Sequence, residues 1–247
     1  MMRAPADSES RPALALLAGG LATRLRPLTL TMPKSMVEVA DEPFIAHQLR
    51  LLAGQGIKEI VICASYLGGQ IEAYVGDGAA FGCNVRYSFD GDRLLGTGGA
   101  LRKALPLLSD PFIVMYGDSY LPTRFAPILT AFDRAELPAL MTVFRNVGRW
   151  DISNVEFVDG VILRHDKVHR TPEMLHIDYG LGLFSASALQ ARMASDQFDL
   201  ADLYGEMARH RRLAGFEVHE RFYEIGSPAG LKETDAYLRR QSSGKPS

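Results

Sequence analysis

The chain has 247 residues, of which 47% are hydrophobic, and it carries a formal net charge of −2 at pH 7. This length and composition suffice for the core of one domain, with or without a small additional lobe. The nearly balanced charge excludes a global basic field of the kind that attracts nucleic acid or an anionic membrane, so any anion-binding site must be built locally.

The two cysteines, Cys63 and Cys83, are too few for a zinc cluster or a disulfide scaffold, which favours a reducing, cytoplasmic environment. No apolar run approaches the ~18 residues of a membrane-spanning helix. The short apolar run 13–18 follows acidic residues and does not resemble a signal peptide. We expect residues 1–11 and 242–247 to be flexible ends.

Apolar runs alternate with amphipathic segments up to about residue 149. Continuous or alternating apolar runs predict strands, and apolar residues three or four positions apart predict helices. The predicted strands are 13–18, 58–65, 84–89, 111–118 and 138–146. The predicted helices are 43–56, 68–78, 98–108 and 122–136.

Repeated strand–helix units indicate an α/β fold with a mostly parallel sheet flanked by helices. In such sheets, ligands bind beyond the carboxyl ends of the strands. The residues that directly follow the predicted strands 13–18 and 111–118 are therefore the first places to look for a functional site.

From about Trp150 the pattern changes to short strands without intervening helices, which predicts a small mixed β lobe. Two helices follow, and a terminal helix begins at Pro228 after the capping residue Ser227. The short strands are 154–158, 160–166 and 175–185, with 215–220 and 221–225 after the helices 185–194 and 200–210. We expect one domain, made of an α/β part, a β lobe and a C-terminal helix, at 12–149, 150–226 and 227–241.

The sequence GGLATRLRPLT (19–29), followed by PKS (33–35), places three cations around a glycine turn at the end of the first strand. The glycines allow a tight turn whose N–H groups can line a phosphate site. Arg24 offers a forked donor and Lys34 a point charge, so a polyphosphate ligand is indicated. The stretch is neither a Walker A motif nor a G-x-G-x-x-G loop, which disfavours ordinary NTPase and NAD sites.

This stretch resembles the signature of the sugar nucleotidyltransferases, also called NDP-sugar pyrophosphorylases, usually written GGxGTRLxPLT…PKP. The segments YLGGQIEAYVGDGAAFG, LLGTGGALRKALPLL, MYGDSY and FYEIGSPAGL also resemble that family, in family order. Within it, the chain is most similar to the heptose 1-phosphate and mannose 1-phosphate guanylyltransferases. The resemblance implies a Rossmann-like sheet, with a nucleotide-binding part at 12–149 and a sugar-binding lobe at 150–226.

The resemblance implies site residues in four groups. The catalytic residues are Arg24, Lys34 and Asp118. The nucleotide-binding residues are Leu17, Ala18, Gly19, Gly20, Thr23, Asp90, Gly96, Thr97 and Gly98. The sugar-phosphate-binding residues are Asn154, Asp166, Lys167, Asp178 and Gly180. The metal ligands are Asp118 and Glu224, which would bind Mg²⁺.

Residue chemistry is compatible with this assignment. Mg²⁺ takes one or two carboxylates plus phosphate oxygens, so Asp118 and Glu224 suffice to begin a site. The glycine-rich stretch from Gly96 opens a helix, whose N–H groups we expect to face the nucleotide. The Asp90 carboxylate could accept the two N–H donors that guanine has and uracil lacks, which favours GTP. Ala22 stands where the family has glycine, and Glu224 stands where many relatives have aspartate.

The predicted reaction joins an NTP, with GTP favoured, to a heptose or mannose 1-phosphate and releases pyrophosphate. Three alternatives stay open. One is a uridylyltransferase acting on N-acetylmuramic acid or glucose 1-phosphate. Another is a non-catalytic regulatory subunit that binds a sugar nucleotide, and the last is a metal-dependent glycosyltransferase that uses Asp90-Gly91-Asp92.

Overall fold

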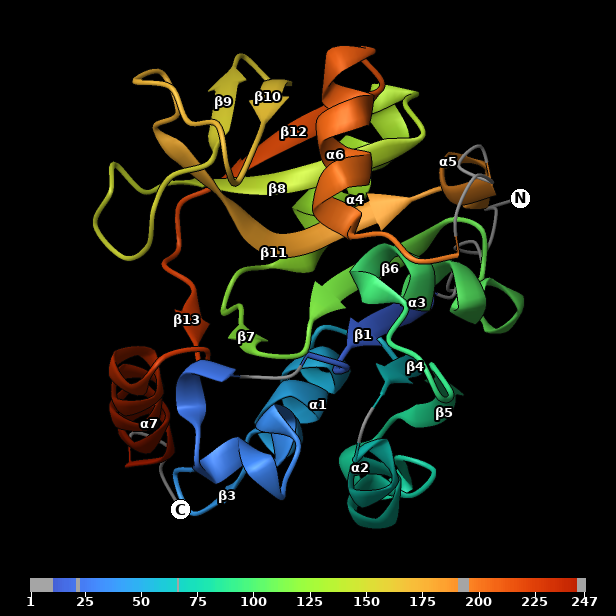
Figure 1. The fold of residues 1–247 in the computed structure, drawn as a ribbon, viewed down its shortest axis with the longest axis vertical. Coiled ribbons are helices and arrows are strands. Elements are labelled where there is room, and N and C mark those ends of the chain that lie inside the picture. The colour runs from blue at the N-terminus through green and yellow to red at the C-terminus, as the bar shows by residue number, and fades with distance from the viewer. Residues whose placement is uncertain (1–10, 21–22, 66, 191–195, 244–247) are drawn as a thin grey trace, which may run out of the picture.

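A nine-stranded β-sheet crosses the whole molecule (Figure 1). The computed structural model describes residues 11–20, 23–65, 67–190 and 196–243. The strands of this sheet are β1 (Leu14–Leu17), β4 (Glu59–Ala64), β5 (Asn84–Phe89), β6 (Phe112–Tyr116), β8 (Ala139–Arg145), β9 (Val155–Val158), β10 (Val161–His165), β11 (His176–Phe184) and β12 (Leu213–Val218). Their order is β5-β4-β1-β6-β11-β8-β12-β10-β9.

Strands β5, β4, β1 and β6, which come first in the sheet order, form the parallel, Rossmann-like half that the sequence predicts. Strand β1 pairs with β4 on one side and with β6 on the other, so that Leu16 lies opposite both Ile62 and Met115. Almost every residue of these three strands is buried, as expected for inner strands of a sheet that is covered on both faces.

Strand β11 lies inside this sheet, although the pattern of residues 175–185 predicted a strand of a small mixed β lobe. It runs antiparallel between β6 and β8, so the second half of the sheet is mixed. The physical reason is the apolar character of the strand on both faces: Leu181 and Leu183 are buried on one side and Phe184 on the other. Of the strands expected in the lobe, the hairpin β9–β10 forms the outer edge beyond β12.

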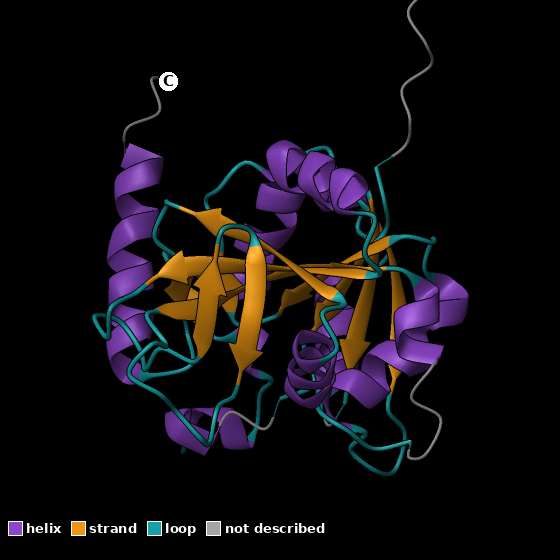
Figure 2. Ribbon diagram, turned by 90° about the horizontal axis from the view of Figure 1, so that it is seen from above, coloured by secondary structure: helices purple, strands orange, loops and turns teal. Residues whose placement is uncertain are grey.

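Helices cover both faces of the sheet (Figure 2). Alternation along β1 assigns its side chains to two cores, because successive residues of a strand point to opposite faces. Leu14 and Leu16 face the first helix group, whereas Ala15 and Leu17 face the second. The first group is α1 (Phe44–Gly54), α2 (Gly68–Val75) and α4 (Phe125–Ala135), and the second is α3 (Gly96–Ala104), α5 (Ala186–Gln190) and α6 (Leu200–Arg209).

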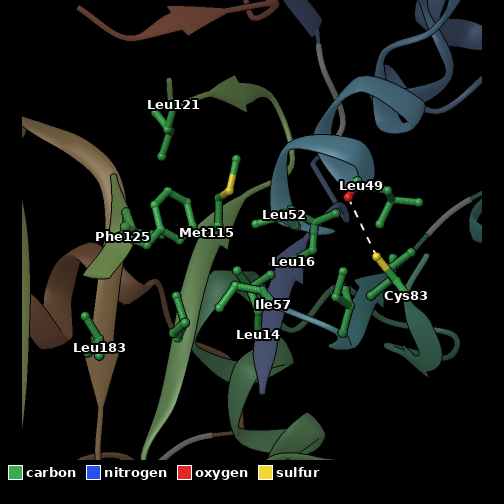
Figure 3. Packing of buried hydrophobic residues seen from close by; sticks show 14 of the residues in the cluster. Leu14, Leu16, Leu49, Leu52, Ile57, Cys83, Met115, Leu121, Phe125 and Leu183 are labelled. Atoms are coloured by element: carbon green, nitrogen blue, oxygen red, sulfur yellow. Dashed lines mark hydrogen bonds between the residues drawn. The ribbon is translucent and has the colours of Figure 1, made fainter. Parts of the chain in front are cut away.

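The larger core connects α1 and α4 to the sheet (Figure 3). Leu49 and Leu52 of α1 are fully buried with Leu16. Cys83 packs at the edge of the same cluster, where its thiol donates to the Leu49 carbonyl at 3.6 Å. Burial raises the pKa of this thiol, so Cys83 behaves as an apolar core residue.

A separate module flanks the parallel half and consists of α7 (Pro228–Ser243), one hairpin and one further antiparallel strand pair. Its small core joins Val39, Phe44, Ile225 and Leu238. The hairpin is β2 (Glu38–Val39) with β3 (Glu42–Pro43), and the other pair is β7 (Ser119–Tyr120) with β13 (Tyr223–Glu224), two strands that lie far apart in the sequence. Short 3₁₀ turns occupy Thr23–Leu25, Leu28–Leu30, Lys34–Met36, Ala79–Phe81 and Leu105–Leu107.

The terminal helix begins as predicted and ends later. The Ser227 hydroxyl accepts a hydrogen bond from the Gly230 N–H at 3.0 Å, which confirms the cap. Ser242 and Ser243 are still helical, and their hydroxyls donate to the carbonyls of Leu238 and Arg239, so the helix runs past its predicted end at residue 241. No helix among the described residues is both long and apolar enough to cross a membrane.

Substituting the central strand tests this account of the core. We expect Leu16→Ala to lower the free energy of unfolding by roughly 2–5 kcal/mol, because it leaves a cavity between two layers. Leu30→Ala is the control, since Leu30 is 51% exposed and its truncation should change stability by less than about 0.5 kcal/mol. Urea unfolding of both variants gives the comparison, and equal losses would contradict the account.

Candidate active site

A pocket of about 330 Å³ lies at the carboxyl ends of β1, β4 and β6, where the sequence predicts a ligand site. Its floor follows one row of the sheet, because Leu17 lies opposite Cys63 on one side and Tyr116 on the other. All three residues line the pocket. The parallel pairing therefore brings three distant segments of the sequence to one place.

Most of the predicted nucleotide-binding residues line this pocket, and Asp118 lines it with them. Ala18 lies directly beyond β1, where its N–H donates to the Cys63 carbonyl at 2.8 Å. The side chain of Thr23 and all of Ala22 fall outside the part of the chain that the structure describes. The predicted nucleotide-binding residues that line the pocket are Leu17, Gly19, Gly20, Asp90, Gly96 and Thr97.

The amides at the start of α3 have partners within the protein. The N–H groups of Gly98 and Gly99 donate to the Phe198 carbonyl at 3.0 and 3.2 Å. A Cβ at Gly98 would overlap the Phe198 ring, so glycine permits this close packing. The prediction that these two N–H groups face the nucleotide was therefore wrong, because the segment 196–199 covers them. Gly96 and Thr97 still border the pocket.

Several pocket residues were missed by the sequence analysis. Asp199 precedes α6, and its carboxylate lies 3.4 Å from both the N–H and the hydroxyl of Thr97. In the sequence, Asp199 reads as the residue that caps the helix 200–210. Its position beside α3 results from the fold and could not be predicted locally. Tyr116 comes two residues before Asp118 at the end of β6, so the alternation of strand side chains could have indicated it. The remaining missed residues are Cys63, Leu94 and Ala100.

Two cations and two carboxylates from different segments converge beside this pocket. Lys34 Nζ and Asp118 Oδ2 form an ion pair of 2.6 Å. The side chains of Lys34, Arg24 and Glu224 come together around Gly226. A Cβ built there would lie 3.1 Å from Lys34 Nζ, 3.2 Å from Arg24 Nη2 and 2.5 Å from Glu224 Oε2. The structure therefore brings together all the residues predicted to be catalytic or metal-binding.

Backbone contacts hold these groups in place. The Gly117 N–H donates to the Leu17 carbonyl at 3.0 Å, and a Cβ at Gly117 would lie only 2.8 Å from the same oxygen. Pairing of β7 with β13 sets Glu224 opposite Ser119, and the Ile225 N–H donates to the Asp118 carbonyl at 3.0 Å. Asp118 and Glu224 are thus backbone neighbours although they lie far apart in sequence.

The Glu224 carboxylate lies at the start of α7. Its Oε2 accepts the Gly226 N–H, and its Oε1 accepts the Ser227 hydroxyl at 2.7 Å. A Cβ at Gly230 would overlap Oε1, so a glycine there gives the carboxylate its space. Anionic groups are favoured at a helix N-terminus, which helps to keep the Glu224 carboxylate in this orientation.

The donor set fits a hard cation. Asp118 and Glu224 offer carboxylate oxygens, each of which can accept more than one partner. Among the described residues there is no group of three or more histidine, cysteine or acidic side chains that could hold a metal alone. Mg²⁺ is the ion that binds through one or two carboxylates and takes its other ligands from substrate phosphates. A magnesium site therefore fits these residues if a phosphorylated substrate completes it.

The predicted sugar-phosphate residues form a hydrogen-bonded network. Asn154 Oδ1 accepts the Asp178 N–H at 3.1 Å, and the Asn154 carbonyl accepts the Asp166 N–H at 3.0 Å. Asp178 Oδ1 accepts the Gly180 N–H at 3.0 Å. The other oxygen, Oδ2, accepts the Tyr116 hydroxyl at 3.3 Å, which links this network to the pocket.

Asp166 and Lys167 have different surroundings. The Asp166 carboxylate accepts the N–H groups of Val168 and His169, and these bonds lower its pKa to about 2. It therefore stabilises its own turn, while Lys167 Nζ lies 5.8 Å from the centre of the Tyr116 ring. Of this predicted pair, Lys167 is the side chain placed beside the nucleotide pocket.

Asp90 has a partly apolar environment at the other end of the pocket. Its Oδ2 accepts the Leu95 N–H at 3.3 Å, and its carbonyl accepts Lys103 Nζ at 3.1 Å. Burial raises the pKa of the Asp90 carboxyl despite these donors. A ligand that donates hydrogen bonds to this carboxylate would therefore be favoured.

Comparison with known proteins agrees with this geometry. The nucleotidyl transferase family model matches residues 14–149, which is more than half of the chain. The chain belongs to the nucleotidyl transferase family. The matched residues contain the pocket floor, the glycine turn, Arg24, Lys34 and Asp118.

Individual relatives differ in their substrates. The N-acetylmuramate α-1-phosphate uridylyltransferase of Neisseria meningitidis is 46% identical over 104 residues, which is 42% of this chain and 45% of that protein. The D-glycero-α-D-manno-heptose 1-phosphate guanylyltransferase of Campylobacter jejuni is 25% identical over 213 residues, covering 86% of this chain and 94% of that protein. The chain thus spans less than half the length of the first of these nucleotidyl transferase relatives.

A solved structure shows the same fold. A candidate glucose-1-phosphate thymidylyltransferase from Bacillus anthracis matches with a TM-score of 0.81 at 20% identity, over 92% of this chain and 94% of that one. At that identity the likeness concerns the fold alone. It confirms the Rossmann-like α/β architecture predicted for this nucleotidyl transferase.

The buried His165 predicts a pH dependence of stability. His165 is only 5% exposed, and burial lowers its pKa from 6.5. The Lys167 charge lowers this pKa further, and the carboxylates of Asp178 and Asp166 oppose the shift. The unfolded chain therefore binds a proton that the native state resists, so stability should fall as pH drops below 6.5. We expect His165→Gln to lose less unfolding free energy than the wild type between about pH 8 and about pH 5. Equal losses in the two proteins would refute this role.

Proposed function

We propose that this chain is a sugar-1-phosphate nucleotidyltransferase that makes an NDP-sugar and pyrophosphate from an NTP and a sugar 1-phosphate. The observation that carries the proposal is the convergence of two cations and two carboxylates at the mouth of the pocket. Family membership supports the reaction class. For the substrates we propose GTP with a heptose or mannose 1-phosphate.

The pocket suits the nucleoside and the charged cluster suits the phosphates. No lysine or arginine lines the pocket itself, as far as the described residues show, so the polyphosphate would extend along Gly19 and Gly20 toward Arg24. Arg24 and the glycine amides would hold the β and γ phosphates. Lys34, which pairs with Asp118, would exchange that partner for α-phosphate oxygens.

The reaction needs little proton transfer. A sugar 1-phosphate oxygen is anionic at neutral pH and can attack the α-phosphorus in line. The new oxygen–phosphorus bond forms while the bond from the α-phosphorus to its bridging oxygen breaks, and pyrophosphate leaves with that electron pair. Positioning and charge neutralisation then dominate catalysis, which matches a site rich in fixed cations.

Asp118 and Glu224 would hold a Mg²⁺ ion, which neutralises phosphate charge and so reduces the repulsion between two anionic reactants. Lys167 would bind the sugar phosphate. Asp178 and Asn154 would form hydrogen bonds with sugar hydroxyls beside Gly180. Asp166 would contribute indirectly, through the turn that carries Lys167.

Two carboxylates favour guanine as the base. Asp90 and Asp199 both line the pocket and can accept hydrogen bonds, and guanine offers N1–H and N2–H₂ donors. The guanylyltransferase from Campylobacter supports this choice. The 46% identity to the Neisseria protein supports UTP as the alternative, with N-acetylmuramic acid 1-phosphate as the sugar substrate.

The cysteines bear on where the protein works. Both Cys63 and Cys83 are buried free thiols, which favours a reducing cytoplasm.

Pyrophosphate release tests the proposal. The grid pairs heptose, mannose, glucose and N-acetylmuramic acid 1-phosphates with GTP, UTP, CTP and ATP, with and without Mg²⁺. Release that requires Mg²⁺ and one substrate pair is expected and would name both substrates. If no pair gives release while control enzymes are active, the catalytic proposal fails, and tight binding of GDP- or UDP-sugars would then favour a regulatory subunit.

Removing either cation should impair turnover strongly. We expect Arg24→Ala and Lys34→Ala each to lower kcat by roughly 10²–10³-fold, because each removes a fixed positive charge from the transition state. Arg86→Ala is the matched control, since Arg86 is exposed on β5 and pairs with Glu59. Losses below about tenfold at both positions would contradict the assigned roles.

Gly226→Ala tests the convergence point directly. The added methyl group would press on Glu224 Oε2 at 2.5 Å and on the two cations at 3.1 and 3.2 Å. We expect kcat to fall by up to about 10²-fold through misplacement of these groups, with a small change in Tm. Gly69→Ala is the control, because a Cβ at Gly69 meets nothing within 4 Å. If both variants keep wild-type activity, the charged groups do not depend on this space.

A further inference from the structure

The Tyr116 ring lies between the nucleotide pocket and the sugar-phosphate network. Tyr116 ends β6, lines the pocket and lies opposite Leu17 in the sheet. On its other side the hydroxyl donates to Asp178 Oδ2 at 3.3 Å. One side chain therefore contacts residues assigned to both substrates.

The ring also supports Lys167. Its ammonium lies 5.8 Å from the ring centre, within the range in which a cation is attracted to an aromatic face. Lys167 follows the strand β10 in an exposed turn, so it has a long flexible side chain that needs an anchor to bind phosphate in one position. Among the described residues, the Tyr116 ring is the aromatic face that holds it.

The hydroxyl orients Asp178. Each oxygen of the Asp178 carboxylate accepts one hydrogen bond. Oδ1 accepts the Gly180 N–H at 3.0 Å, and Oδ2 accepts the Tyr116 hydroxyl at 3.3 Å. Asp178 is then fixed, with its remaining lone pairs available to a sugar hydroxyl.

The position of Tyr116 is itself well defined. The Gln48 side chain is fully buried, and its Nε2 donates to the carbonyls of Tyr116 at 3.2 Å and Ser119 at 2.8 Å. Gly180 has φ +99°, and a Cβ there would lie 3.4 Å from Tyr116 Cδ2. The Gln48 hydrogen bonds fix the backbone at Tyr116, and Gly180 lets β11 pack closely against the ring. The ring is therefore held in one position between the two proposed substrate sites.

We propose that Tyr116 is a positioning residue for the sugar 1-phosphate, which holds Lys167 for the phosphate through its ring and Asp178 for a sugar hydroxyl through its oxygen. The proposal rests on the proposed function. The hydroxyl and the ring of Tyr116 then make separate contributions. Loss of the hydroxyl should weaken binding of the sugar 1-phosphate alone. Loss of the ring should also release Lys167 and remove part of the wall of the nucleotide pocket.

Kinetics of Tyr116→Phe and Tyr116→Leu test this division, with the substrate pair identified by pyrophosphate release. Tyr116→Phe should raise KM for the sugar 1-phosphate by about tenfold and leave KM for the NTP and kcat within about twofold. Tyr116→Leu should raise both KM values and lower kcat. Tyr87→Phe is the matched control, because its hydroxyl also makes one hydrogen bond, to the Gly76 carbonyl, away from the site.

A double-mutant cycle decides whether the hydroxyl acts through Asp178. In the Asp178→Asn background, Tyr116→Phe should have little further effect on KM for the sugar 1-phosphate. Additive effects, or equal changes in KM for both substrates from Tyr116→Phe, would overturn the proposal. Thermal unfolding must show that each variant folds, which the retained ring of Tyr116→Phe favours.

Binding distinguishes failure of this inference from failure of the proposed function. Calorimetric titration with mannose 1-phosphate and separately with GTP needs no turnover. A wild type that binds both ligands without turnover contradicts the catalytic proposal, but a weaker affinity of Tyr116→Phe for mannose 1-phosphate alone still supports Tyr116. Equal affinities of wild type and Tyr116→Phe for mannose 1-phosphate overturn the inference. If the wild type does not bind mannose 1-phosphate, the titration is repeated with heptose, glucose and N-acetylmuramic acid 1-phosphates, and binding of none of the four overturns the inference.

Discussion

Two cations and two carboxylates held within a few ångströms of one another are the constraint on which this site depends. Lys34 and Asp118 form an ion pair of 2.6 Å, and Glu224 accepts hydrogen bonds from the Gly226 N–H and the Ser227 hydroxyl at the start of α7. We propose that the substrates and Mg²⁺ exchange these partners for phosphate oxygens and a metal ion. Gly226 leaves the space in which the exchange can occur.

The rest of the fold serves to assemble this cluster and the pocket beside it. Parallel pairing sets Leu17, Cys63 and Tyr116 in one row, and the close approach of Gly117 to β1 directs Asp118 to the end of that row. The β7–β13 pairing then returns the chain to deliver Glu224. Antiparallel β11, beside β6, brings Asp178 and Gly180 to the same end of the strands, where we propose that the two substrates meet.

Local patterns in the sequence predicted the parallel half of the sheet and the glycine turn, because hydrophobic period and turn chemistry are properties of short segments. They did not predict that Phe198 covers the start of α3 or that Asp199 enters the pocket, since these contacts join segments about 100 residues apart through the order of the strands. The same reason explains β11: its apolar run was recognised as a strand, but its place inside the sheet is a property of the whole topology. The hydrogen bonds that occupy Asp166 likewise depend on the conformation of its turn.

Labelled GTP tests whether the two cations beside Gly226 hold a departing pyrophosphate. GTP labelled with ³²P at the α position, and separately at the γ position, is incubated with the sugar 1-phosphate, Mg²⁺ and the enzyme. We expect the α label to appear in the NDP-sugar and the γ label to appear in pyrophosphate. A γ label that appears in the sugar product or in inorganic phosphate would contradict this expectation, because the cations beside Gly226 would then not be holding a departing pyrophosphate.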